Sequence, residues 1–176
     1  LDLSDGSLIL AEKKYEVNGE KCFYFSELFL ECRAPLSQKS KLDIVTRAVD
    51  QVAKKYYGDE DAQKKMEIKD IICNELEEQG EIKVSELREK VFPGSPEMLE
   101  ELDEKLDRYN LSYETVAPKN EQTIKKFQKQ KLYTDTGIEI TIPMEEYRNP
   151  DHVEFITNMD GTISVLIKNI GMLSSK

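Results

Sequence analysis

The stretch VEFITNMDGTISVLIKNI, which runs from Val153 to Ile170, holds two apolar, β-branched segments apart with a cluster of Asn, Asp and Gly. Two such segments around turn residues are typical of a β-hairpin. Asn and Asp side chains bond the backbone of their own turn and Gly accepts positive φ, so Asn158, Asp160 and Gly161 are explained without any chemistry. The stretch therefore predicts two antiparallel strands, at 153–157 and 162–168.

An EF-hand calcium loop also carries a glycine among Asn and Asp residues, at its sixth position. If Gly161 took that position, Ile156 and Ile167 would stand where the two strongest oxygen ligands belong. The flanking residues also have the pattern of strands rather than of helices. The sequence therefore predicts no calcium site in this turn.

Catalytic signatures are absent from the sequence, which contains no GxSxG, HExxH, P-loop or GxGxxG motif. Acidic residues are numerous, but no pair is singled out for proton transfer. The single histidine, His152, stands beside Asp151 and Pro150, in the context of a turn. We therefore predict that the protein is no enzyme and has no catalytic residue, no metal ligand and no cofactor.

The cysteines and the chain start bear on the compartment. Cys22, Cys32 and Cys73 form no CxxC pair, which favours reduced thiols over a disulfide frame or a zinc site. No run of about 18 apolar residues occurs, so no membrane span is predicted. The chain starts at Leu1 without a basic and apolar leader, which argues against a signal peptide and suggests a piece of a longer polypeptide.

The formal net charge of −10 over 176 residues is unevenly spread. Residues 59–107 contain 17 acidic and 7 basic side chains, a net charge of −10, so the remainder of the chain is neutral. Residues 119–133, in contrast, contain five lysines and one glutamate, a local charge of about +4. Because the overall charge repels phosphate at long range, contact with nucleic acid requires such a local basic surface.

A second hairpin is predicted at residues 7–26, where Asn18-Gly19 supplies the two positive-φ residues of a type I′ turn. Ser7-Leu8-Ile9-Leu10 and Tyr15-Glu16-Val17 precede this turn, and Cys22-Phe23-Tyr24-Phe25 follows it. The next segment, residues 27–32, is apolar enough to be buried, either as a short helix or as a strand extension.

Apolar residues at steps of three or four predict helices at about 40–57, 59–79, 84–92 and 96–109. Ser40 and Ser95 are expected to cap the first and the last of these helices, with Pro96 at the first helical position. The first helix is expected to present one apolar face, formed by Leu42, Val45, Val49, Val52 and Tyr56.

The order of the last three helices is reminiscent of a helix-turn-helix. The recognition helix of that motif usually carries basic and amide side chains. Here that helix reads Glu100-Glu101-Leu102-Asp103-Glu104, and phosphates would repel it. A helical bundle with a solvated acidic face is therefore favoured.

Near the C-terminus, Ile138, Ile140 and Ile142 alternate with polar residues, which predicts a half-buried strand that Pro143 ends. Residues 144–147 predict one helical turn. We expect an α+β fold, in which the N-terminal hairpin and the C-terminal strands join into one antiparallel sheet packed against the central acidic helical segment. A lone hairpin is barely stable, so the strands need this partnership. One domain is expected over 1–176, with sub-regions 1–35 (β-hairpin), 36–112 (helical) and 113–176 (β-rich).

Several of these residues together resemble a known family. The runs 126–131, 134–140, 153–156, 160–164 and 167–170 are similar in kind and order to the bacterial nucleoid-associated protein family. Its members copurify with the bacterial chromosome and are described as DNA-associated. The resemblance implies a cytoplasmic, nucleoid location, a role in chromosome organisation, and double-stranded DNA, contacted directly or indirectly, and other nucleoid proteins as partners. It also implies that this chain is the C-terminal half of a longer protein.

Two functions follow from this resemblance and from the charge pattern. The preferred one is a non-enzymatic nucleoid component that associates with DNA weakly and without strong sequence preference, because lysines neutralise phosphates without reading bases. The candidate contacts are Lys119, Lys125, Lys126, Lys129, Lys131 and Lys168. Phe127 and Tyr133 are candidates for stacking on bases, although core positions are favoured for both. The alternative is a protein-interaction module whose acidic helical face, 59–107, binds a basic DNA-handling partner.

Overall fold

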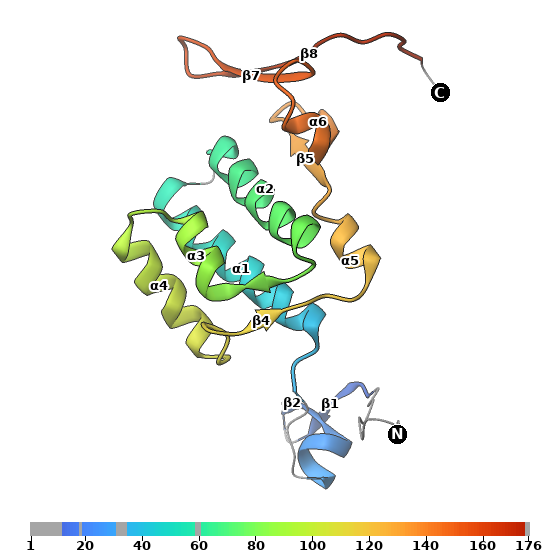
Figure 1. Cartoon of the computed structure of the whole chain (residues 1–176). Helices are drawn as coiled ribbons and strands as arrows, with labels where there is room; N and C mark the ends of the chain where they lie inside the picture. Colours follow the sequence, from blue (N-terminus) through green and yellow to red (C-terminus); the bar gives the residue numbers. More distant parts are fainter. Residues whose placement is uncertain (1–11, 18, 31–34, 59–60, 175–176) are drawn as a thin grey trace. The chain divides into compact units, whose positions relative to one another are not determined.

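The computed structural model describes residues 12–17, 19–30, 35–58 and 61–174, and it divides the chain into two compact units, residues 1–37 and 38–176. Helices and strands are mixed in the chain, and every pair of strands is antiparallel (Figure 1). The α+β class is therefore confirmed. The expectation that residues 1–176 form one domain stays a prediction.

The first unit contains the predicted hairpin. Strands β1 (Lys14–Val17) and β2 (Glu20–Phe23) pair with Val17 opposite Glu20, so the turn has two residues, and Gly19 has the positive φ of 84° that such a turn needs. A π-helix, η1 (Tyr24–Phe29), follows β2 directly. The predicted segment Ser7–Leu10 lies outside the described residues.

The burial expected for residues 27–32 is wrong where the structure describes them, because Leu28, Phe29 and Leu30 are exposed. The sequence left open whether this segment is a short helix or a strand extension, and η1 shows that it is a helix as far as Phe29. Two polar contacts hold this helix, since the N–H of Ser26 donates to the carboxylate of Glu12 at 3.2 Å and the N–H of Phe23 donates to that of Glu27 at 2.9 Å. So short a segment has few neighbours to pack against within a unit of this size.

The second unit is built on four helices whose inward faces form one core (Figure 1). These are α1 (Gln38–Tyr57), α2 (Ala62–Glu78), α3 (Val84–Val91) and α4 (Pro96–Asp107). Apolar residues at helical spacing explain this packing, since the buried positions of α1 are Leu42, Val45, Ala48, Val49, Val52 and Ala53. The predicted apolar face is confirmed except for Tyr56, which is exposed.

The helix ends differ from the prediction at two serines. α1 begins at Gln38, so Ser40 lies inside its first turn rather than before it. Ser95 does stand at the N-cap of α4, with Pro96 next to it, but its side chain makes no capping hydrogen bond. Side-chain capping bonds occur at α2, where Asp61 accepts from the N–H of Lys64 at 2.9 Å, and at Asn120, which accepts from the N–H of Gln122 at 2.8 Å.

The α3–turn–α4 segment has a small sheet beside it. Strand β3 (Ile82–Lys83) precedes α3 and pairs with β4 (Thr115–Val116), which follows α4. Ile82 and Val116 are opposite one another in this pair, and both are buried in the helical core. The strands therefore hold the two ends of the α3–α4 segment together.

The remainder of the second unit consists of two hairpins and two short helices. α5 (Glu121–Lys125) leads into β5 (Lys129–Tyr133), which pairs with β6 (Glu139–Pro143). α6 (Met144–Tyr147) then leads into β7 (Val153–Thr157), which pairs with β8 (Ile163–Ile167). The helical turn at 144–147 and the hairpin at 153–168 are thus confirmed.

The turn of the last hairpin has the predicted chemistry. Gly161 has φ 84°, and the carboxylate of Asp160 accepts hydrogen bonds from the N–H of Thr162 at 3.0 Å and from its hydroxyl at 2.7 Å. These bonds hold the pKa of Asp160 below its ordinary value. Asp160 is therefore occupied within its own turn.

The single joint sheet was the wrong part of the fold prediction. Within the described residues, every sheet has two strands, and β1–β2 pairs with neither of the C-terminal hairpins. The β5–β6 hairpin is held instead to α2 by side-chain hydrogen bonds, and Arg148 at the end of α6, between the two hairpins, also bonds α2. Where those contacts end, apolar side chains of the hairpins remain exposed, among them Ile138, Ile156, Ile163 and Ile167.

Candidate nucleic-acid interface

The six candidate lysines come from three places in the second unit. Lys119, Lys125 and Lys126 flank or end the short helix α5, Lys129 and Lys131 lie on β5, and Lys168 follows β8. The structure thus places five of them along one continuous segment. Lys168 belongs to the other hairpin.

Strand β5 separates its side chains by the two-residue period of a strand. Lys129, Lys131 and Tyr133 point outward and are exposed, while Gln130 is buried and Leu132 is half-buried. Tyr133 keeps 69% of its surface exposed, so its expected core position is wrong, whereas Phe127 does pack against the helical core. The outward face of β5 therefore carries two ammonium groups and one aromatic ring.

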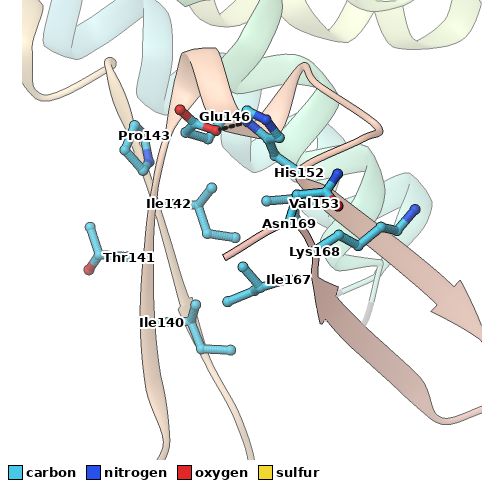
Figure 2. Close-up of a pocket in the computed structure, with 10 residues that line it drawn as sticks. All are labelled: Ile140, Thr141, Ile142, Pro143, Glu146, His152, Val153, Ile167, Lys168 and Asn169. Carbon is cyan, nitrogen blue, oxygen red and sulfur yellow. Dashed lines mark hydrogen bonds and ion pairs between the residues drawn. The ribbon is translucent and has the colours of Figure 1, made fainter. Parts of the chain in front are cut away.

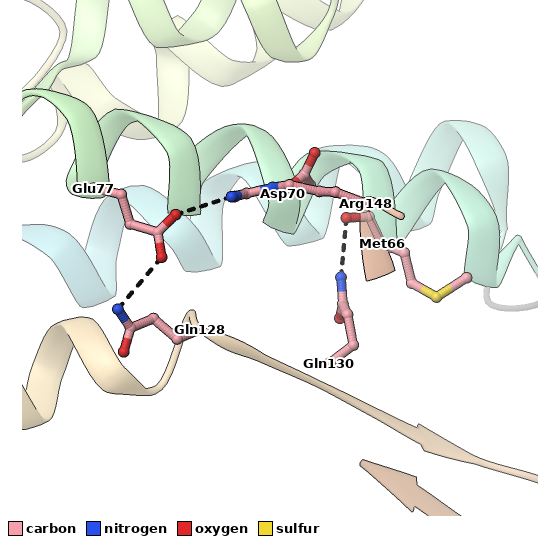
Figure 3. Close-up of polar contacts among 6 residues, drawn as sticks. All are labelled: Met66, Asp70, Glu77, Gln128, Gln130 and Arg148. Atoms are coloured by element: carbon pink, nitrogen blue, oxygen red, sulfur yellow. Dashed lines mark hydrogen bonds and ion pairs between the residues drawn. The ribbon is translucent and has the colours of Figure 1, made fainter. Parts of the chain in front are cut away.

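Polar contacts to α2 fix the position of β5 (Figure 3). The buried amide of Gln130 donates to the main-chain carbonyl of Met66 at 3.0 Å, and the amide of Gln128 donates to Glu77 at 3.3 Å. Both partners lie on α2, one near each end of the helix. The strand is thereby held along α2 with its lysines on the side away from the buried amide.

Arg148, which caps α6, makes a second attachment to α2 (Figure 3). Its guanidinium bonds Asp70 at 2.5 Å and Glu77 at 3.0 Å. Burial alone would lower the pKa of Arg148, but the hydrogen bonds and charges of these two acids raise it. This arginine therefore pairs with two acids of the central helical segment, and their repulsion of DNA phosphates is reduced.

Three of the six lysines have an acidic neighbour. Lys125 pairs with Glu121 at 3.5 Å, Lys131 with Glu139 at 3.4 Å, and Lys168 with Glu154 at 2.6 Å. The first two pairs are exposed on both sides, and such pairs contribute only about 0–1 kcal/mol, so a phosphate can compete for them. Lys168 is held more firmly, because its ammonium also donates to the carbonyl of Pro150 at 3.1 Å.

The other three candidates, Lys119, Lys126 and Lys129, are exposed and form no ion pair with any residue that the structure describes. With Lys125 and Lys131 they give the α5–β5 segment its net positive charge. We refer to these five residues as the α5–β5 lysines.

Lys69 of α2 is a further basic residue that the sequence reasoning missed. Its ammonium donates to the main-chain carbonyl of Lys129. Burial lowers the pKa of Lys69, and the nearby charge of Lys131 lowers it further. Lys69 therefore brings a further amine to the main chain of β5, near the charge of Lys131. Nothing in the sequence pattern pointed to this contact.

The acidic helical segment presents its own surface on α1 and α4. A pocket of about 480 Å³ is lined by Lys55, Tyr56, Glu97, Glu100, Glu101, Glu104, Lys105 and Arg108. Glu101 is bound by Lys55 at 2.5 Å and by Lys105 at 3.7 Å, while Glu97, Glu100 and Glu104 add negative charge around them. The helix that would read DNA in a helix-turn-helix is therefore acidic on its outer side, as expected.

A second pocket, of about 330 Å³, lies between the two C-terminal hairpins (Figure 2). Ile140 and Ile142 of β6 point into the space that they share with Ile167, and the ring of His152 lies at the rim, bonded to Glu146. The lining is mostly apolar. His152 thus has a partner within its own turn region.

Within the described ranges of the chain, no group of three or more His, Cys, Asp or Glu residues is arranged to hold a metal ion. None of the helices described combines the length and the apolar character that crossing a bilayer requires.

Fold and surfaces together define a small α+β protein in which an acidic helical surface and a lysine-bearing hairpin are separate features. The family described as "Nucleoid-associated protein YejK" matches residues 5–172, nearly the whole chain, and the protein belongs to this nucleoid-associated family. The family that the sequence resembled is thereby confirmed. Neither the curated proteins nor the solved structures contain a match to this chain.

Proposed function

We propose that this protein is a non-enzymatic component of the bacterial nucleoid in the cytoplasm, and that it binds double-stranded DNA directly, weakly and without strong sequence preference. The observation that carries the proposal is the outward face of β5, where Lys129 and Lys131 project together and Lys69 of α2 joins them. The family places the chain among nucleoid-associated proteins, and the α5–β5 lysines supply the chemistry.

Lysines of this kind act through counterion release. Each ammonium group that neutralises a phosphate frees condensed cations, so the logarithm of the affinity falls with the logarithm of the salt concentration, with a slope of about −0.9 per phosphate. Five lysines therefore predict a slope of roughly −4 to −5. The ammonium groups of β5 would contact DNA phosphates, which are the same in every DNA sequence. Little base preference is therefore expected.

The acidic surface works against this contact and limits its strength. The net charge of −10 repels DNA at long range, and screening by salt shortens that repulsion to about 10 Å at 0.1 M. The α5–β5 lysines must then act locally. Weak affinity at moderate salt is the expected result.

A second function is favoured by the pocket on α1 and α4. Glu97, Glu100 and Glu104 form no ion pair with another described residue, and the exposed ring of Tyr56 lines the same pocket. Such a surface is complementary to a lysine- or arginine-rich segment of a DNA-handling protein. In that case the partner, rather than this chain, would contact the DNA.

The experiment that separates the two functions measures DNA retention by this chain across a salt series. The test variant carries Lys125→Glu, Lys126→Glu and Lys129→Glu. The matched control carries Lys39→Glu, Lys64→Glu and Lys83→Glu, three exposed lysines of α1, α2 and β3 whose reversal changes the net charge by the same amount.

Direct binding predicts a steep salt dependence that the test variant loses and the control largely keeps. Equal losses in both variants would assign the effect to overall charge and would contradict a local interface. If the unaltered chain retains no DNA at low salt, direct binding is wrong, and capture of a lysine-rich peptide by the acidic pocket becomes the function to measure.

A further inference from the structure

The last hairpin has one strand edge whose backbone groups are free. The N–H of Lys168 bonds the carbonyl of His152, and the N–H of Asn158 bonds the carbonyl of Thr162. Because hydrogen-bonded pairs alternate along an antiparallel ladder, the even-numbered residues of β8 bond β7, and Ile163, Val165 and Ile167 direct their N–H and C=O groups to the opposite side. Within the described residues, β8 has no other strand beside it.

This edge also carries none of the usual protection against pairing. Natural edge strands are blunted by charged side chains, prolines, bulges or a covering segment. β8 reads Ile-Ser-Val-Leu-Ile, without a charge or a proline, and Ile163, Leu166 and Ile167 keep 50%, 46% and 51% of their surfaces exposed. Such an edge is a template for another strand.

The outer edge of β5 shows the contrast within the same unit. Lysines project from that strand, and the ammonium of Lys69 occupies the outward carbonyl of Lys129. The outer edge of β5 is therefore protected against pairing with another strand, whereas that of β8 is not. The difference points to β8, rather than to exposed strands in general, as an interaction surface.

We propose that the β8 edge binds the β8 edge of a second copy of this chain, in an antiparallel pair about a two-fold axis at Val165. In this register Ile163 lies opposite Ile167 of the partner, and all five residues of each strand are paired. The outward groups of residues 163, 165 and 167 then exchange hydrogen bonds across the axis. The two hairpins become one four-stranded sheet, which supplies the additional strands that a lone hairpin requires.

The uncharged sequence of β8 favours a second copy as the occupant. The paired strands contain no charged residue, so no like charges meet at the axis. At each end, Lys168 of one copy lies diagonally from Asp160 at the turn of the other, since residue 168 stands opposite residue 162. Lys168 already pairs with Glu154 at 2.6 Å and Asp160 already accepts from Thr162, so this diagonal adds little attraction, but it brings no like charges together.

The test places charges on the axis. Val165→Lys puts two ammonium groups opposite one another in the assembly, and Val165→Glu does the same with two carboxylates. Each variant alone is expected to be monomeric in sedimentation over a concentration series in which the unaltered chain dimerises. An equimolar mixture of the two is expected to restore a dimer that contains one chain of each kind, because the introduced charges then attract.

A control on the other strand of the hairpin separates this effect from unfolding. Thr157→Lys and Thr157→Glu introduce the same charges on β7 and are expected to leave the dimer intact. A second readout uses Val165→Cys, which is expected to give a disulfide-linked, reducible dimer under mild oxidation, since paired residues have Cα atoms about 5.5 Å apart. The unaltered chain, with its native cysteines, is the baseline.

Four results would overturn the proposal, three of which concern the dimer itself. These three results are an unaltered chain that stays monomeric at every concentration, a dimer that survives both Val165 charge variants, and separate monomers in the mixture of the two although each variant is folded. Association into species that grow without limit would also contradict it, because a two-fold pair of edges closes at two copies.

Discussion

The buried amide of Gln130 in β5 donates a hydrogen bond of 3.0 Å to the main-chain carbonyl of Met66 in α2, across 64 residues of sequence (Figure 3). This bond determines which face of β5 turns inward. A buried polar side chain needs a hydrogen-bond partner, so Gln130 must face Met66. Because side chains alternate along a strand, the lysines on either side of Gln130 then face the solvent. The proposed interface therefore depends on one uncharged residue.

Replacing Gln130 by Ala is expected to lower the free energy of unfolding by about 1–3 kcal/mol, because a buried hydrogen bond and the side-chain volume around it are lost together. Gln128→Ala is the matched control, since its bond to Glu77 is exposed and 3.3 Å long. That change is expected to stay within about 0.5 kcal/mol. Urea unfolding measures both, and equal effects would show that the buried bond is not what holds β5.

Arg148→Met removes the guanidinium that bonds Asp70 and Glu77. We expect reduced stability at neutral pH, because two partly buried acids lose their positive partner. The pKa of Glu77 is lowered: burial raises it, but the hydrogen bond from Arg148 and the other contacts outweigh that effect. A carboxyl whose pKa is lower in the folded state stabilises the fold above its unfolded pKa, and this contribution is lost as the pH falls through the folded value.

The stability difference between the unaltered chain and Arg148→Met is therefore expected to be full at pH 6–7 and to shrink as the pH falls below the ordinary glutamate pKa of 4.5. Thermal unfolding at a series of pH values measures this difference. Arg108→Met, a change of the same kind at the end of α4, is the control. A difference that grows toward acid pH would contradict the assigned role of Glu77.

Cys73 of α2 is expected to resist alkylation. Burial, with the nearby charge of Glu77, raises the pKa of its thiol to about 11. The reactive thiolate is then on the order of one part in a thousand at pH 8, and the rate should rise about tenfold per pH unit. Iodoacetamide followed by peptide mass spectrometry measures the rate, with the half-exposed Cys22 as the internal reference. Equal rates at Cys73 and Cys22 in the folded chain would contradict the burial of this thiol.

The sequence predicted those parts of the fold in which local chemistry and packing agree. The strands at 153–168 were found because β-branched residues flank a turn whose Asn, Asp and Gly allow one conformation. The core of α1 and α2 was found because its apolar residues repeat at helical spacing. In both places, residues a few positions apart in the sequence determine the secondary structure and its buried face.

Strand β5 was missed for the opposite reason. Its inward residue is Gln130 and its outward residues are lysines, so the pattern contains almost no apolar alternation. A buried glutamine is recognised only when its partner, 64 residues away, is known. Lys69 was missed in the same way, because an isolated lysine of a helix gives no sign that it reaches a strand beyond residue 119.

The joint sheet was predicted from a sound premise, that hairpins need partners, but sequence patterns do not name the partner. α2 instead supports the β5–β6 hairpin through Gln128 and Gln130, and it bonds the end of α6, which precedes β7, through Arg148. The requirement for more strands remains unmet at β8, whose outer edge has no strand beside it within the described residues. The proposed pairing of two copies follows from this edge.

Lys69→Met tests whether the amine of α2 belongs to the DNA contact that we propose. If it does, the slope of the salt dependence should become less negative by about 1, the contribution of one lost phosphate contact. Lys69→Arg should keep the slope, because it keeps the charge. Lys64→Met is the matched control, since Lys64 is an exposed lysine of the same helix, paired with Glu67 at 2.7 Å. Lys69 also bonds the carbonyl of Lys129, so unfolding of the variant is measured in parallel. An unchanged slope in a folded Lys69→Met protein would remove Lys69 from the interface and leave the contact to the α5–β5 lysines.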